Sequence, residues 1–83
     1  FTPNGDQKND GFAPINTGVE EYRLLVYDRW GKLIFDEIGE NPIWDGNNAN
    51  GVPCKTDSYS YRVDYKTFSG DRHTSNGVVF LIR

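Results

Sequence analysis

The clearest pattern in the chain is an alternation of apolar and polar positions between residues 58 and 66. The apolar set is Tyr59, Tyr61, Val63 and Tyr65, and the polar set between them is Ser60, Arg62 and Asp64. A period of two places each set on its own face, so Ser58 to Lys66 is predicted to be a strand with one buried face. A second segment, Tyr22 to Tyr27, is apolar on both faces apart from Arg23. It is predicted to be the core strand, either covered on both sides or central in a sandwich.

Turn residues next to these strands predict two hairpins. Asp28-Arg29-Trp30-Gly31 forms a tight turn with Gly in the left-handed position, and Lys32 to Asp36 returns as the paired strand. Phe68-Ser69-Gly70-Asp71 joins Tyr59 to Thr67 with Thr74 to Ile82, and Asn76-Gly77 is expected to bend or bulge the returning strand. The chain from Val78 to Ile82 is apolar on both faces. An exposed edge formed by such a strand is either an aggregation liability or a docking site.

The connection between the hairpins, Ile38 to Asp57, is rich in Gly, Asn and Pro and has no helical period. A structureless loop of that length is uncommon in a compact domain, so it is expected to carry a short strand or a specific role, with Trp44 pinning it to the core. Apolar residues at helical spacing are lacking elsewhere too, and β-branched and aromatic residues dominate the regular segments. The pattern predicts an all-β fold, a β-sandwich.

Size and charge restrict the function. The 83 residues suit one domain, and the formal net charge of -3 gives no attraction for nucleic acid or an anionic bilayer. The longest apolar run falls far short of the ~20 residues that span a membrane, so no membrane insertion is expected. Cys54 has no second cysteine to pair with, and with His73 it makes too few ligands for structural zinc. A Cys54/His73 catalytic dyad is disfavoured, because the two residues lie on separate segments and so small a domain rarely encloses a catalytic pocket.

Two polar groups are candidate binding sites. The opening places side-chain oxygens at Asn4, Asp6, Asn9 and Asp10, which are ligands that calcium prefers. Lys8 breaks the EF-hand spacing, and Asx-turns of the same residues are the favoured alternative. Trp44-Asp45-Gly46-Asn47-Asn48 offers a stacking ring and amides for a carbohydrate or a metal. The favoured alternative there is a buried Trp44 followed by a turn.

Five sequence blocks occur in an order and spacing that resemble a known family. They are Phe1-Thr2-Pro3-Asn4-Gly5-Asp6 with Asn9-Asp10, Tyr27-Asp28-Arg29-Trp30-Gly31, Trp44-Asp45-Gly46, Asp57-x-Tyr59-x-Tyr61 and Leu81-Ile82-Arg83. Together they resemble the gliding motility-associated C-terminal domain, the type B sorting domain of the type IX secretion system of Bacteroidota. The chain departs from the family in having Gln7 where many members have Gly. It also has an unusual Pro53-Cys54 approach to its third strand.

The resemblance implies an immunoglobulin-like β-sandwich of about six to seven antiparallel strands. It implies that residues 1–83 are a single C-terminal domain of a larger secreted protein, and the first residue, Phe rather than Met, agrees with a piece of a longer chain. The implied role is export of that cargo, via the periplasm, to the cell surface or medium, without catalysis. The implied partners are components of the type IX translocon and a PorP/SprF-type outer-membrane barrel.

Partner recognition is assigned by this resemblance to the signature positions Asn4, Gly5, Asp6, Asn9, Asp10, Trp30, Gly31, Trp44, Asp45, Gly46, Leu81, Ile82 and Arg83. No cofactor is expected apart from the candidate calcium. Two alternatives stay open. A carbohydrate- or surface-binding module predicts that the rings of Trp30 and Trp44 are both exposed on one face. A calcium-stiffened spacer of a surface adhesin predicts a large gain in melting temperature with calcium.

Overall fold

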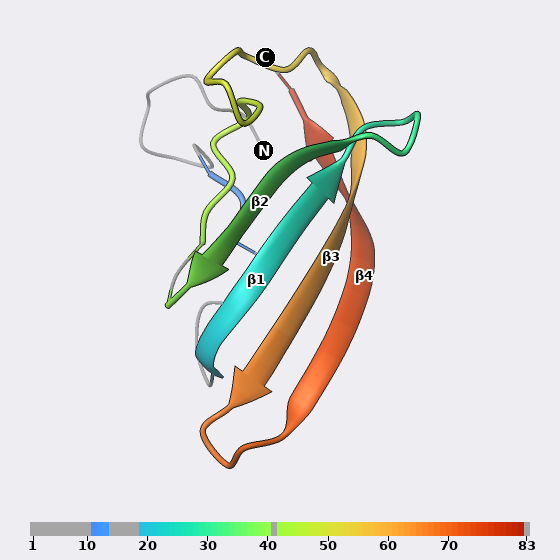
Figure 1. Ribbon diagram of the computed structural model, residues 1–83. Helices are drawn as coiled ribbons and strands as arrows, with labels where there is room; N and C mark the ends of the chain where they lie inside the picture. Colours follow the sequence, from blue (N-terminus) through green and yellow to red (C-terminus); the bar gives the residue numbers. More distant parts are fainter. Residues whose placement is uncertain (1–10, 14–18, 41, 83) are drawn as a thin grey trace.

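The computed structural model describes residues 11–13, 19–40 and 42–82, and its regular elements are four β-strands. They are β1 (Val19–Tyr27), β2 (Leu33–Gly39), β3 (Asp57–Thr67) and β4 (Arg72–Leu81), which form one antiparallel sheet in the order β2-β1-β3-β4 (Figure 1). The all-β prediction is confirmed for the described residues, which contain no helix. Accordingly, no helix of this part is long and apolar enough to cross a membrane.

Both predicted hairpins are present. In the β1–β2 turn the carboxylate Oδ1 of Asp28 accepts hydrogen bonds from the backbone N–H of Trp30 at 2.8 Å and of Lys32 at 2.9 Å. Gly31 has the left-handed φ of 80° that its position in the turn predicts. Gly70 in the β3–β4 turn has a φ of 96°. Local turn chemistry therefore sets the pairing of β1 with β2 and of β3 with β4.

One face of the sheet, here called the inner face, holds the core. β1 is a central strand of the sheet, and Leu24, Leu25 and Val26 are buried in succession, as predicted for the core strand. On β3, Tyr59 and Val63 are buried while Ser60 and Arg62 are exposed, as the alternation predicts. The core cluster comprises Tyr22, Leu24, Val26, Trp44, Tyr59, Val63, Val79 and Leu81.

The bulge predicted at Asn76-Gly77 is wrong, whereas the bend stays a prediction. The β3–β4 register runs without a shift from Asp57 opposite Leu81 to Lys66 opposite Arg72. Gly77 faces Tyr61, and a Cβ added at Gly77 would lie 2.5 Å from the Tyr61 hydroxyl oxygen. The glycine is therefore explained by an aromatic ring that lies over it. The register shifts that do occur are on β1, where it pairs with its neighbours.

Residues 42–56 cover the inner face, which is the specific role expected for the long connection. The segment is yellow-green in Figure 1 and lies beside the short blue segment 11–13. The two segments exchange backbone hydrogen bonds, from Phe12 N to Trp44 O at 2.8 Å and from Trp44 N to Phe12 O at 3.0 Å. The Tyr22 hydroxyl of β1 donates to the carbonyl of Pro42. Burial, reinforced by the negative charge of Glu37, raises the pKa of Tyr22, so this hydroxyl stays a proton donor.

The immunoglobulin-like sandwich of six to seven strands is not reproduced by the described residues. Within the described residues, four strands lie in one sheet, and the layer over its inner face contains only isolated bridges, Phe12 with Trp44 and Asn47 with Pro53. The second sheet stays a prediction.

Candidate recognition surface

Six of the predicted recognition residues lie outside the described residues. They are Asn4, Gly5, Asp6, Asn9, Asp10 and Arg83, and they include all four candidate calcium ligands. The calcium site therefore stays a prediction. Among the described residues, no group of three or more His, Cys, Asp or Glu side chains is arranged to hold a metal ion.

Trp44, Asp45 and Gly46 build the fold. The Trp44 ring is fully buried, packs edge-on against Tyr59 at 5.1 Å, and donates from Nε1 to the carbonyl of Asn47 at 2.9 Å. Asp45 Oδ1 accepts the backbone N–H of Asn47 at 3.0 Å, and Gly46 has a φ of 87°. This confirms the interpretation of Trp44 as an anchor followed by a turn. It also removes the stacking platform that the carbohydrate-binding alternative requires, because only one of the two tryptophans is exposed.

Trp30 is that exposed tryptophan, with 83% of its surface accessible at the tip of the β1–β2 turn. The guanidinium carbon of Arg29 lies 5.5 Å from the centre of its ring, a cation–π contact. Asp28 and Gly31 hold the backbone of this turn, so the fold makes little use of the indole. An aromatic side chain displayed on a tight turn is preorganised for a partner, since little backbone freedom is lost on binding.

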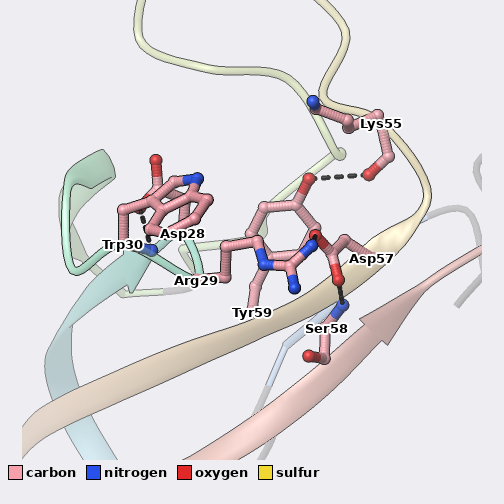
Figure 2. Close-up of polar contacts among 7 residues, drawn as sticks. All are labelled: Asp28, Arg29, Trp30, Lys55, Asp57, Ser58 and Tyr59. Carbon is pink, nitrogen blue, oxygen red and sulfur yellow. Dashed lines mark hydrogen bonds and ion pairs between the residues drawn. The ribbon is translucent and has the colours of Figure 1, made fainter.

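Arg29 ties this turn to the beginning of β3. Its Nη1 lies 3.5 Å from Oδ2 of Asp57, whose Oδ1 accepts the backbone N–H of Ser58 at 2.8 Å (Figure 2). The hydroxyl of Tyr59, two residues further along, donates to the carbonyl of Lys55 at 2.6 Å. Asp57 pairs in the sheet with Leu81. The Trp30 turn, the first residues of β3 and the end of β4 thus lie at one end of the sheet.

The end of β4 presents alternate residues to opposite sides. Val79 and Leu81 are buried in the core, while Val78, Phe80 and Ile82 are exposed by more than half. Phe80 and Val78 pair across the sheet with residues 58 and 60, both serines, whose small side chains leave the larger ones standing above the surface. Of the residues predicted for recognition here, Ile82 is therefore accessible and Leu81 is part of the core.

Charged side chains occupy the same face further along the strands. Arg23 makes two hydrogen bonds to Asp36, of 2.8 Å from Nε and 2.6 Å from Nη2. Asp64 accepts the Thr74 hydroxyl at 2.7 Å and Arg62 Nε at 3.1 Å. The Arg23 hydrogen bonds hold the pKa of Asp36 below its ordinary value of 3.8. The Thr74 hydrogen bond, followed by that of Arg62, likewise lowers the pKa of Asp64.

These two carboxylates predict a small loss of stability in acid. A carboxylate whose pKa is lower in the folded chain stabilises it above the unfolded pKa, and this contribution is lost as pH falls through the folded pKa. We therefore expect Asp36→Asn to lower the melting temperature at pH 6 and to have less effect below pH 3.8, the ordinary carboxyl value. Because the pair is solvent-exposed, a shift of a few degrees at most is expected. Melting curves of both proteins from pH 2 to 7 measure it, and a difference that grows in acid would contradict the assignment.

Cys54 and His73 lie at opposite ends of the domain, Cys54 in the covering loop and His73 on β4. Cys54 is half-buried in the covering loop, near Tyr59. His73 is exposed at the other end of β3 and β4, where its ring stacks on Tyr65 at 5.2 Å. The two side chains therefore form no dyad.

The fold and its exposed residues define a small all-β module with an aromatic and apolar surface at one end of the sheet. A family model, the CHU_C type IX secretion signal domain, matches residues 1–81. The chain belongs to this family, so it is a sorting signal rather than a catalytic domain. It interacts with the type IX secretion system, which exports proteins to the cell surface or medium. No curated protein and no solved structure matches the chain.

The match confirms the family resemblance drawn from the five sequence blocks. The resemblance did not single out Val78, Phe80, Arg29 or Asp57 for recognition. The sequence did indicate that Val78 and Phe80 are exposed, because an edge strand that is apolar on both faces leaves one apolar face uncovered. The Arg29–Asp57 contact joins residues 28 positions apart and has no sequence signal.

Proposed function

We propose that residues 1–83 form the C-terminal sorting domain of a larger secreted protein and carry that cargo across the outer membrane. The observation that carries the proposal is the match of the type IX secretion signal domain to residues 1–81. The cargo reaches the translocon through the periplasm and is then displayed on the cell surface or released. The domain itself performs no chemistry; it is recognised as a folded surface.

The partner proposed for type B signals of this kind is a PorP/SprF-type outer-membrane barrel. Support comes from the exposed side chains at one end of the sheet, since Trp and Arg are enriched among residues that anchor protein interfaces. Trp30 and Arg29 supply that pair here. The negative formal charge of the domain favours a protein partner over nucleic acid.

The immunoglobulin-like sandwich is retained as part of the proposal. Its support is the almost complete burial of Tyr22, Leu24 and Trp44 between the sheet and its covering layer, which is the core position of a two-layer fold. The described cover consists of bridges instead of a ladder. Amide hydrogen exchange across the covering layer tests whether it is hydrogen-bonded as a second sheet.

A secretion assay tests the function directly. Residues 1–83 are fused to the C-terminus of a fluorescent protein that bears a periplasmic signal peptide. The fusion is expressed in a Bacteroidota host with an intact translocon, in one without it, and in one lacking only its PorP/SprF-type barrel. Reporter is expected outside the first strain and in the periplasm of the other two. Periplasmic reporter in all three strains would contradict the sorting role, and export without the barrel would contradict only the choice of partner.

A further inference from the structure

The outer face of the sheet, opposite the core, has two unlike halves. In one half Arg23 is paired with Asp36, and Arg62 with Asp64, which also bonds Thr74. These charged groups form ion pairs and hydrogen bonds with one another within the domain, so a partner that bound here would have to break these existing interactions. Separating them would cost free energy that new contacts must offset.

The other half carries exposed apolar side chains. Val78, Phe80 and Ile82 project from β4 and its end, with exposed fractions of 61%, 63% and 53%. Trp30 lies at the same end of the sheet, in the β1–β2 turn, where the neighbouring Arg29 contacts Asp57 at the start of β3 (Figure 2). We name the four side chains Trp30, Val78, Phe80 and Ile82 the terminal patch.

The size of the terminal patch indicates a small interface. Its four side chains expose roughly 500 Å² together, since a large aromatic side chain alone accounts for about 150–250 Å². A patch of this size is often functional on a monomer. A stable homodimer of standard size needs about 800 Å² on each subunit, so a second copy of the chain is disfavoured as the occupant. A brief contact with a different protein fits better, and a sorting signal must in any case leave its partner.

Charge disfavours a lipid surface as the occupant. Interfacial membrane binding combines apolar side chains with free basic residues that attract anionic headgroups. Arg29, the basic side chain next to Trp30, is paired with Asp57, and the chain has a formal net charge of -3. An apolar protein surface matches the terminal patch without requiring any ion pair to break.

We propose that the terminal patch docks on an apolar surface of an outer-membrane component of the type IX machinery, with Trp30 as the anchor. The proposal rests on the sorting function and names the surface that performs it. Asp28, Arg29 and Gly31 hold the turn, and thus the indole, in place for binding. The serines opposite Val78 and Phe80 keep the β4 side chains accessible to the partner.

Matched pairs of variants in the fluorescent fusion test the docking surface. Trp30→Ala is compared with Phe68→Ala, which truncates an aromatic residue of 75% exposure at the opposite end of the sheet. Val78→Ser is compared with Ile38→Ser, an outer-face residue of 64% exposure on β2. Export is expected to fall about tenfold or more for Trp30→Ala, as for truncation of an interface anchor. It is expected to fall severalfold for Val78→Ser and to stay unchanged for both controls, with all four melting temperatures near that of the parent.

Photocrosslinking identifies the occupant. A benzoylphenylalanine placed at position 78 of the purified fusion is incubated with outer membranes from hosts with and without the translocon, and the adduct is identified by mass spectrometry. A type IX outer-membrane component is expected as the adduct, and the same probe at position 38 is expected to give none. Crosslinks only to a second copy of the fusion, or only to lipid, would overturn the proposal.

Export of the parent fusion and of its variants distinguishes the sorting function from the docking surface. If the parent fusion is not exported, the sorting function itself is wrong. If the parent fusion is exported and the Trp30→Ala and Val78→Ser variants are each exported equally well, the sorting function stands and the proposed docking surface is wrong.

Discussion

Trp44→Ala is expected to lower the free energy of unfolding by about 3–5 kcal/mol, the cost of truncating a fully buried tryptophan. The Trp44 side chain has no accessible surface, packs against Tyr59, and donates a hydrogen bond to Asn47 O. A domain of this size has only about 4–12 kcal/mol of stability, so the melting temperature should fall by about 15 °C or more. Thermal and urea unfolding followed by circular dichroism measure the loss.

Trp30→Ala is the matched control, because it removes the same side chain from a position that is 83% exposed. A change within about 0.5 kcal/mol is expected there. Trp44→Phe retains a ring but removes the Nε1 donor to Asn47, so an intermediate loss is expected, and this variant remains measurable if Trp44→Ala does not fold. Equal losses for the two alanine variants would mean that Trp44 is not the anchor of the covering layer.

Strands and hairpins were predictable because their causes are local. Alternation over a few residues distinguishes the buried Tyr59 and Val63 from the exposed Ser60 and Arg62. Gly31 and Gly70 mark turns because the left-handed backbone region is open to glycine at little cost. The anchoring role of Trp44 was predictable from its position as a large apolar residue in a polar loop.

The errors concern contacts between residues distant in sequence. Gly77 was interpreted as part of a bend or bulge in β4, whereas a side chain at this position is excluded by the Tyr61 ring across the sheet, 16 positions away. The pattern of residues 78–82 shows that one apolar face of β4 is left uncovered, but which of its two faces packs on the core depends on the segments that cover the sheet. Loops also lack a period, so the sequence could not show whether residues 42–56 pair as strands or cover the core irregularly.

Leu81→Ala is expected to destabilise the domain by about 2–5 kcal/mol, whereas Ile82→Ala should change stability by less than about 0.5 kcal/mol. The residues are adjacent and equal in size, but Leu81 is fully buried and Ile82 is 53% exposed. Their sequence block assigns both to recognition, and the structure divides the block into a core residue and a surface residue. Urea unfolding gives the two free energies, with an unchanged dependence on denaturant concentration as the check that only stability has changed.

Export by the same two variants separates folding from recognition. Ile82→Ala is expected to reduce export while leaving the melting curve intact, because Ile82 belongs to the terminal patch. Leu81→Ala is expected to reduce export only as far as it unfolds the domain, so its export should recover at a lower growth temperature, where more of the protein is folded. If Ile82→Ala recovered in the same way, its effect would be on stability, and recognition would not depend on this end of β4. If instead Leu81→Ala and Ile82→Ala destabilised the domain equally, the side chains of residues 81 and 82 would not lie on opposite sides of the sheet.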